Sequence, residues 1–204
     1  MNTLKKNIIH PPRLLAISFL LAILIGAGLL CLPAASRSGH ISFINALFTS
    51  TSAICVTGLT VVDTATYFSL FGQVVIMCLI QLGGLGIMTF SSFILLTAGR
   101  SVTLTGKMVV EGSFRPAVIS DFRSLLRDVF TFTFGLEALG AILLLVRFKG
   151  DLAPGQAIFS SVFHAISAFC NAGFSLFSDS LMSYRSDLAI NLIMMILIIA
   201  GGLG

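Results

Sequence analysis

The chain has 204 residues, of which 56% are hydrophobic and only 10% are charged, and its mean hydropathy is +1.04. Ordinary soluble domains contain about 25% charged residues, so this composition excludes a soluble globular protein and predicts an all-α, polytopic membrane protein. The net charge of +4 is interpreted as a signal of membrane orientation and not of nucleic-acid binding, because basic residues in membrane proteins concentrate on the cytoplasmic side.

Four apolar stretches are predicted to form transmembrane helices, since about 20 apolar residues are needed to span a bilayer. The third stretch is interrupted only by Glu137. In chain order the four are residues 14–32, part of 64–99, 129–146 and 188–204.

Two further uncharged stretches, residues 41–62 and 152–178, contain many serines and threonines or a proline and a histidine. They are too apolar for solvated loops and too polar to face lipid. Non-helical backbone is tolerated at membrane depth only where it is buried in protein or lines a watery cavity. We therefore expect each stretch to enter and leave the membrane on one side, as a half-helix (residues 41–54 and 157–169) followed by extended backbone.

The basic residues agree with this topology. If the N-terminus is cytoplasmic and each re-entrant stretch returns to its own side, eight of the 12 Lys and Arg residues lie inside and four lie outside, as the positive-inside rule requires. Residues 99–128 then form a basic cytoplasmic connector. The outer carboxylates are interpreted as solvated loop charges, with attraction of cations to a pore mouth as the alternative; they are Asp63, Asp151, Asp179 and Asp187.

The sequence also repeats itself at an interval of about 115 residues. Ser-Ala-x-Cys-x-x-Gly occurs twice, at residues 52–58 and 167–173. A Gly-Ala-x-Leu-Leu pair precedes the two copies and a Gly-Gly-Leu-Gly pair follows them, in the same order and at similar offsets. This order indicates a tandem repeat. We predict a first unit at residues 1–98, the connector at 99–128, and a second unit at 129–204 that stops within its last helix.

The repeated heptapeptide does not resemble a helix end, a catalytic motif or a metal site. Each unit crosses the membrane twice, so the units are parallel and are related by an axis along the membrane normal. Their loops then converge on that axis, where backbone carbonyls can replace the hydration shell of an ion. Gly58 and Gly173 would supply backbone conformations open mainly to glycine; the alternative is that they are ordinary turn residues.

At these loops the sequence resembles a known family. TSAICVTGLT (51–60), QLGGLGIMTF (81–90) and SAFCNAGFSLF (167–177) resemble the Trk/Ktr/HKT superfamily of potassium transporters, over essentially the whole chain. The short N-terminal segment is most similar to the Ktr-type membrane subunits. The resemblance implies tandem helix–pore-loop–helix repeats of K⁺-channel type, of which this chain holds about two of an expected four and thus the N-terminal half.

The resemblance also implies the residues of a selectivity filter that holds K⁺ through its backbone only. Leu59 and Phe174 would flank this filter. The filter residues themselves would be Cys55, Val56, Thr57 and Gly58 in the first loop, and Cys170, Asn171, Ala172 and Gly173 in the second.

The function implied by the resemblance is K⁺ uptake across a bacterial inner membrane, with Na⁺ as a coupling ion and no directly bound cofactor. The implied partners are the lipid bilayer, a second copy of the full-length subunit, and a cytosolic nucleotide-binding regulatory ring. The alternative is a truncated, non-conducting membrane fragment that serves at most as an assembly module.

Few other residues indicate chemistry. Glu137 is a candidate for ion coordination or gating, although interhelical hydrogen bonding is the favoured interpretation. The histidines His10, His40 and His164 are scattered without metal-ligand spacing. The chain lacks a combination of nucleophile, base and orienting residue, so we predict that it is not an enzyme. The glycines of residues 83–86 are expected to let a helix pack closely against a pore loop.

Overall fold

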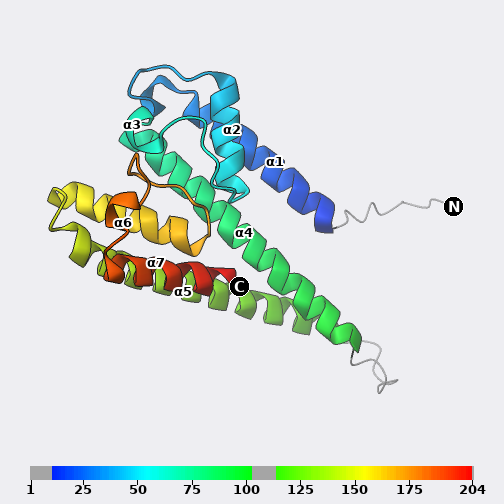
Figure 1. Ribbon diagram of the computed structural model, residues 1–204. Helices are drawn as coiled ribbons and strands as arrows, with labels where there is room; N and C mark the ends of the chain where they lie inside the picture. Colours follow the sequence, from blue (N-terminus) through cyan, green and yellow to red (C-terminus); the bar gives the residue numbers. More distant parts are fainter. Residues whose placement is uncertain (1–10, 103–113, 204) are drawn as a thin grey trace.

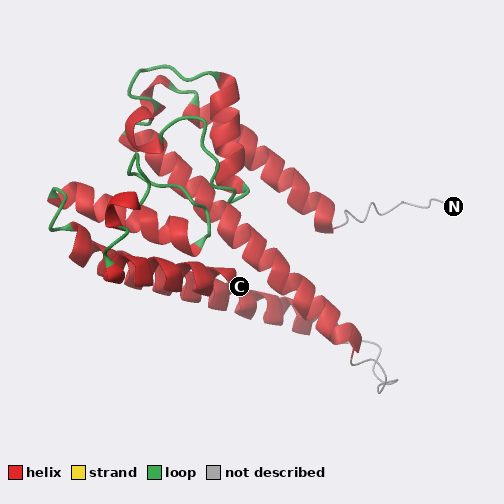
Figure 2. Ribbon diagram, in the orientation of Figure 1, coloured by secondary structure: helices red, strands yellow, loops and turns green. Residues whose placement is uncertain are grey.

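The structure is a computed structural model that describes residues 11–102 and 114–203, and this part of the chain consists of helices and loops without a β-strand (Figures 1 and 2). The predicted all-α class is therefore confirmed. In chain order the elements are α1 (Pro11–Leu30), the 3-10 helix η1 (Pro33–Ala35), α2 (Phe43–Ile54), α3 (Thr64–Tyr67), α4 (Leu70–Val102), α5 (Phe114–Phe148), α6 (Pro154–Phe169), the 3-10 helix η2 (Met182–Tyr184) and α7 (Leu188–Gly202).

The two expected half-helices correspond to α2 and α6. Helix α2 begins after Ser42, whose side chain caps the helix by accepting a hydrogen bond from the Asn45 N–H at 3.3 Å. Helix α6 begins at Pro154, three residues before the predicted start, because proline is favoured in the first turn of a helix, where its missing N–H costs nothing. With 12 and 16 residues, these helices are about 18 and 24 Å long, shorter than the roughly 30 Å hydrocarbon core.

Helices α4 and α5 extend further than predicted. Helix α4 continues to Val102 and α5 starts at Phe114, so helix occupies both ends of the stretch assigned to a connector at 99–128. The middle of that stretch, residues 103–113 with Lys107, lies outside the described residues.

Within the described residues, two stretches are long and apolar enough to cross a membrane, Leu70–Thr89 in α4 and Leu126–Phe148 in α5. The apolar helices Ala16–Leu30 and Leu188–Gly202, from the first and fourth predicted spans, are shorter than a membrane crossing needs within the described residues. The outer surfaces of α1, α5 and α7 nevertheless remain strongly apolar: Ile25 is 63% exposed, Phe132 is 55% exposed and Ile199 is 61% exposed. Apolar exposure on this scale is typical of surfaces that are covered by lipid or by another protein.

The anchors of the sequence repeat make matching contacts in the two halves. A Cβ added at Gly83 of α4 would lie 2.1 Å from the Ile54 carbonyl oxygen at the end of α2. A Cβ added at Gly201 of α7 would lie 1.7 Å from the Phe169 carbonyl oxygen at the end of α6. Helices α4 and α7 thus touch the C-terminal ends of α2 and α6 at positions where only glycine fits, as expected from the sequence for residues 83–86.

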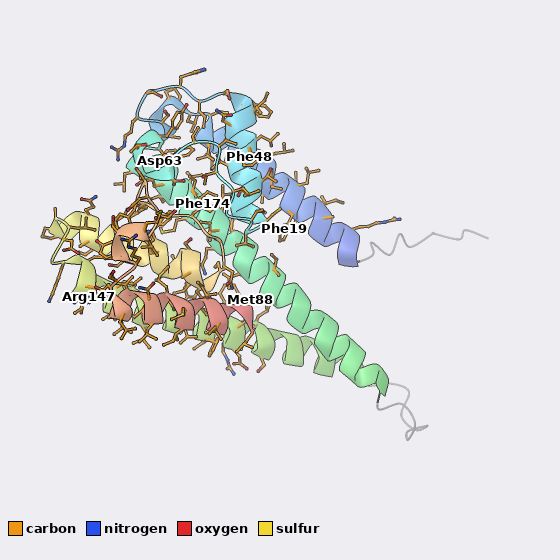
Figure 3. All side chains as sticks on the ribbon, viewed as in Figure 1. Phe19, Phe48, Asp63, Met88, Arg147 and Phe174 are labelled. Atoms are coloured by element: carbon orange, nitrogen blue, oxygen red, sulfur yellow. The ribbon has the colours of Figure 1, made fainter. Side chains whose placement is uncertain are left out.

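A hydrogen-bonded ion pair fixes the start of α7. Asp187 accepts hydrogen bonds from the Ala189 N–H at 3.0 Å and the Ile190 N–H at 3.1 Å, as an N-cap does. The same carboxylate pairs with Arg147, near the end of α5. The hydrogen bond from Arg147 is the main reason why the pKa of Asp187 lies below its ordinary value. Arg147 and Asp63 lie toward the left of the view in Figure 3, whereas Met88 lies nearer to the middle of the molecule.

The glycine contact between α7 and α6 can be tested with two neighbouring positions. Gly201→Ala would force α7 away from the Phe169 carbonyl, and such overpacking costs about 1–3 kcal/mol. The thermal midpoint of the protein in detergent, followed by far-UV circular dichroism, should therefore fall by several degrees. Gly202→Ala is the matched control, because a Cβ there meets only the Asn171 side chain at 3.7 Å. Equal midpoints for the two variants would contradict the close contact.

Candidate functional site

The end of α2 has an unusual backbone geometry. Val56 has a positive φ of 50°, which is an outlier for a β-branched residue. Its N–H donates to the Ala53 carbonyl at 3.3 Å, and the Thr57 N–H donates to the Ser52 carbonyl at 2.9 Å. These two bonds with a left-handed residue between them form a Schellman motif, which satisfies carbonyls that the helix leaves free.

The end of α6 repeats this geometry. Asn171 has a φ of 59° and its N–H donates to the Ala168 carbonyl at 3.0 Å, while the Ala172 N–H donates to the Ser167 carbonyl at 2.8 Å. The heptapeptide therefore contains the ends of α2 and α6, at residues 54 and 169 as expected for the half-helices, although its sequence does not resemble a helix end. The reason is that valine and asparagine occupy the left-handed position, which glycine usually marks in a sequence.

The glycine of each heptapeptide lies two residues further on, at the point where the two loops meet. Gly58 has a φ of 77° and Gly173 a φ of 71°, both in the left-handed region that favours glycine. A Cβ added at Gly58 would lie 2.8 Å from the Ala172 carbonyl oxygen and 3.2 Å from the Gly173 Cα. A Cβ at Gly173 would lie 3.2 Å from the Gly58 Cα. Independent turn residues would not need this mutual contact.

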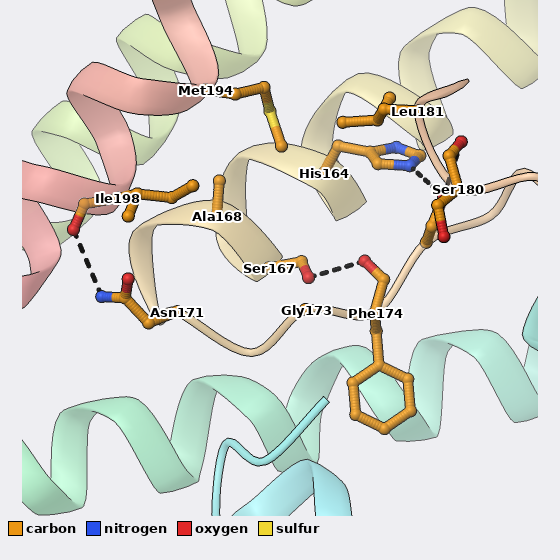
Figure 4. Close-up of a pocket in the computed structure, with 11 residues that line it drawn as sticks. His164, Ser167, Ala168, Asn171, Gly173, Phe174, Ser180, Leu181, Met194 and Ile198 are labelled. Atoms are coloured by element: carbon orange, nitrogen blue, oxygen red, sulfur yellow. Dashed lines mark hydrogen bonds between the residues drawn. The ribbon is translucent and has the colours of Figure 1, made fainter. Parts of the chain in front are cut away.

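The other predicted filter residues lie beside these glycines but differ in burial between the loops. In the first loop Cys55 and Thr57 are exposed and Val56 is half-buried. In the second loop Cys170 and Ala172 are buried, whereas Asn171 is exposed. The two flanking positions differ most. Leu59 is 59% exposed, whereas Phe174 is 2% exposed and its ring lies against α4 (Figure 4).

A polar cavity of about 300 Å³ lies beyond the two glycines and is lined by both loops. Asp63 is part of its wall and accepts hydrogen bonds from Ser178 at 2.5 Å, from Thr66 at 2.7 Å and from the Ala65 N–H at 2.9 Å. Burial raises the pKa of Asp63, but these hydrogen bonds outweigh it and hold the pKa below its ordinary value. Asp63 is thus not merely a solvated loop charge, because its carboxylate connects the exits of the two loops.

Glu137 lies behind the second loop and is 5% exposed. The Gln81 side chain of α4 donates to Glu137 Oε1 at 3.0 Å, and the Cys170 thiol lies 3.9 Å from the same oxygen. This geometry is the interhelical hydrogen bonding that the sequence favoured. Glu137 therefore ties α5 to α4 and to the first residue after α6.

His164 is the residue that sequence reasoning missed. It is 1% exposed and lies in α6, beside the non-helical segment of residues 174–177 that leaves the second loop (Figure 4). This segment and its counterpart at residues 59–62 are not β-strands, but they are called the second and the first strand below. Its Nδ1 is 2.7 Å from the Ser160 carbonyl oxygen, and its Nε2 is 3.0 Å from Ser175 Oγ. Metal-ligand spacing does not single out His164 in the sequence. Its position within the repeat does, because the first unit has Thr49 at the equivalent position.

Comparison with known proteins places the chain in a family. The pattern of the TrkH family, described as cation transport protein, matches residues 15–204. The chain is 47% identical over 194 residues to the Ktr system potassium uptake protein B of Bacillus subtilis, a match that covers 95% of this chain and 43% of that protein. It is 42% identical over 193 residues to the protein of the same name from Vibrio alginolyticus, with 95% and 42% covered.

A third relative is the potassium/sodium uptake protein NtpJ of Enterococcus hirae, 38% identical over 208 residues, with 100% of this chain and 46% of that protein covered. The chain thus spans less than half the length of these relatives. The matches confirm the resemblance seen at the two loops, and the extent of the family match shows that this chain belongs to the TrkH family of cation transport proteins.

Proposed function

We propose that this chain is part of the ion-translocating subunit of a K⁺ uptake system, in which K⁺ passes along the two glycine-containing loops. The observation that carries the proposal is the contact of Gly58 with Gly173, both left-handed and both four residues beyond the end of a short helix. Two loops that meet through backbone alone present carbonyl oxygens without intervening side chains, which is the chemistry of a K⁺ filter. The printed names of the relatives, which are potassium or potassium/sodium uptake proteins, support K⁺ as the substrate.

The directions of α2 and α6 favour a cation beside the two loops. Both helices reach the loops with their C-terminal ends, where a helix carries the equivalent of about half a negative charge. Asp63 adds a carboxylate on the side of the polar cavity. No charged side chain of the chain belongs to either predicted filter segment, so the ion ligands in this proposal are the backbone carbonyls of residues 55–58 and 170–173.

We extend this proposal to the architecture of the whole transporter. The two units are helix–pore-loop–helix repeats of K⁺-channel type and form two of an expected four around the ion path. A bacterial inner membrane with a cytoplasmic N-terminus, Na⁺ as coupling ion, homodimerisation and a nucleotide-binding regulatory ring are further parts of the proposal that rest on the family. A non-conducting fragment is not favoured, since the chain matches uptake proteins along nearly its full length.

Growth at low K⁺ tests the proposed substrate. A bacterium that lacks its own K⁺ uptake systems should grow in submillimolar K⁺ when it expresses the chain from its complete reading frame. Accumulation of K⁺, measured by flame photometry, should rise in parallel. Expression in the membrane without any gain in K⁺ accumulation would refute the proposed function.

The filter assignment can be tested at the first glycine. Gly58→Ser places a Cβ against the Ala172 carbonyl and a side chain on a left-handed backbone, at a cost of about 1–3 kcal/mol. The loops should separate, and the preference for K⁺ over Na⁺ in uptake assays should fall by about tenfold, since 1.4 kcal/mol is a factor of ten. Gly28→Ala is the control, because a Cβ at Gly28 meets nothing within 4 Å. Normal expression with unchanged ion preference would remove Gly58 from the filter.

The orientation of the connector is tested by labelling. In whole cells, Lys107→Cys should react with a membrane-impermeant maleimide only after the cytoplasmic side has been opened, because the topology puts residues 103–113 inside. The parent protein with its native cysteines reports background labelling. Reaction in intact cells would overturn the re-entrant topology.

A further inference from the structure

The strand that leaves the second loop is attached to α6 by two buried side chains. Ser167 donates its hydroxyl hydrogen to the Phe174 carbonyl at 2.7 Å (Figure 4). The Leu176 N–H donates to His164 Nε2 at 3.4 Å. Because Nε2 accepts this bond, the ring hydrogen is on Nδ1 and donates to the Ser160 carbonyl. Neutral His164 thus holds residue 176 on one side and the backbone of its own helix on the other.

Aromatic packing keeps His164 in this position. The Phe177 ring is stacked on the imidazole with a centroid distance of 4.8 Å. Phe148 and Phe163 contact the imidazole edge-on, each at 5.9 Å. A side chain that is packed on several sides has few rotamers available, so the direction in which Nε2 points is fixed by the fold.

Helix α2 carries a hydroxyl side chain at each of the two equivalent positions, but neither is hydrogen-bonded to the first loop. Thr49 stands at the repeat position of His164, and Ser52 stands at that of Ser167. The two side chains are 2% and 4% exposed, and neither hydroxyl has a hydrogen-bond partner among the described residues. Such unpaired buried hydroxyls are rare in proteins.

The flanking residues show the same asymmetry. Phe174 follows Gly173 and is 2% exposed, whereas Leu59 follows Gly58 and is 59% exposed. The second strand is therefore packed and hydrogen-bonded to its helix. The first strand instead meets the second at the glycine contact.

We propose that His164 and Ser167 are positioning residues that set the ion preference of the filter, by fixing the second strand against which the first is placed. The inference rests on the proposed function and adds the residues that determine its specificity. Selectivity among ions of one charge depends on how far carbonyl oxygens can move toward the smaller ion. The bonds to Phe174 and Leu176 limit the movement of carbonyl oxygens in the second strand. Because the first strand contacts the second at Gly58 and Gly173, its movement is limited as well.

The serine pair gives a matched test at one repeat position. Ser167→Ala removes the bond to Phe174, whereas Ser52→Ala removes a hydroxyl that has no partner. In the protein expressed from its complete reading frame, Ser167→Ala should lower the ratio of K⁺ to Na⁺ uptake about 3- to 10-fold, the range of one lost hydrogen bond. Ser52→Ala should stay within about twofold of the parent.

The histidine is tested by substitution and rescue. Asparagine has a polar atom at the distance of Nδ1, but its acceptor oxygen is one bond closer to Cα than Nε2 and does not reach the Leu176 N–H. Glutamine carries an oxygen at the same number of bonds from Cα as Nε2. His164→Asn should therefore lower the ion preference as Ser167→Ala does, and His164→Gln should largely restore it. Thr49→Val, at the same position in the first unit, should leave the preference unchanged.

Several outcomes would overturn the inference. Equal effects of Ser52→Ala and Ser167→Ala would show that the two loops are not held differently. If His164→Asn lowers uptake only in proportion to the amount of protein in the membrane, with the parental ion preference and K⁺ KM, the residue is structural. If His164→Asn does not reach the membrane, the comparison of Ser167→Ala with Ser52→Ala decides the inference: a lower ion preference in Ser167→Ala only supports it, and equal effects overturn it. Gly173→Ser distinguishes a failure of this inference from a failure of the proposed function, because an unchanged ion preference in that variant would refute the filter itself.

Discussion

The contact between Gly58 and Gly173 exists because neither residue has a side chain and both adopt a left-handed backbone. A Cβ on Gly58 would lie 2.8 Å from the Ala172 carbonyl oxygen, too close for an ordinary contact, so this approach requires that the surrounding elements hold the two loops together. Two Schellman motifs give both loops the same local geometry at their start, and Asp63 with Ser178 joins their exits. Most of the polar bonds near the site therefore serve to position backbone and not to expose reactive side chains.

Glycine is also the means by which the helices are packed around the loops. In lipid the hydrophobic effect does not drive helices together, so association depends on close van der Waals contact and on hydrogen bonds. Gly83 and Gly201 allow α4 and α7 to touch the last carbonyls of α2 and α6. The bond from Gln81 to Glu137 adds a polar connection between α4 and α5 at the same level as the second loop. A buried carboxylate here serves assembly, because its partners are an amide and a thiol on two other elements.

The two halves follow one plan but differ in what holds their loops. Helix caps, left-handed residues and glycine contacts recur at equivalent positions, while His164 and Thr49 do not correspond in chemistry. A single chain can carry such a difference because its units evolve separately, whereas a symmetric homo-oligomer repeats every residue. In the proposed filter, the second loop would then be held by its own helix, and the first loop by its contact with the second.

Much of this protein was determined by the sequence alone. Composition and apolar length predict a helical membrane protein, and the repeat predicts the places of α2 and α6 and of the two glycines, because these features depend on local periodicity and backbone freedom. The left-handed Val56, the unpaired Thr49 and Ser52, and the partners of His164, Asp63 and Glu137 were decided only by the tertiary structure. Their partners lie on other turns of the backbone or on other helices, and a linear pattern does not record which buried donor meets which acceptor.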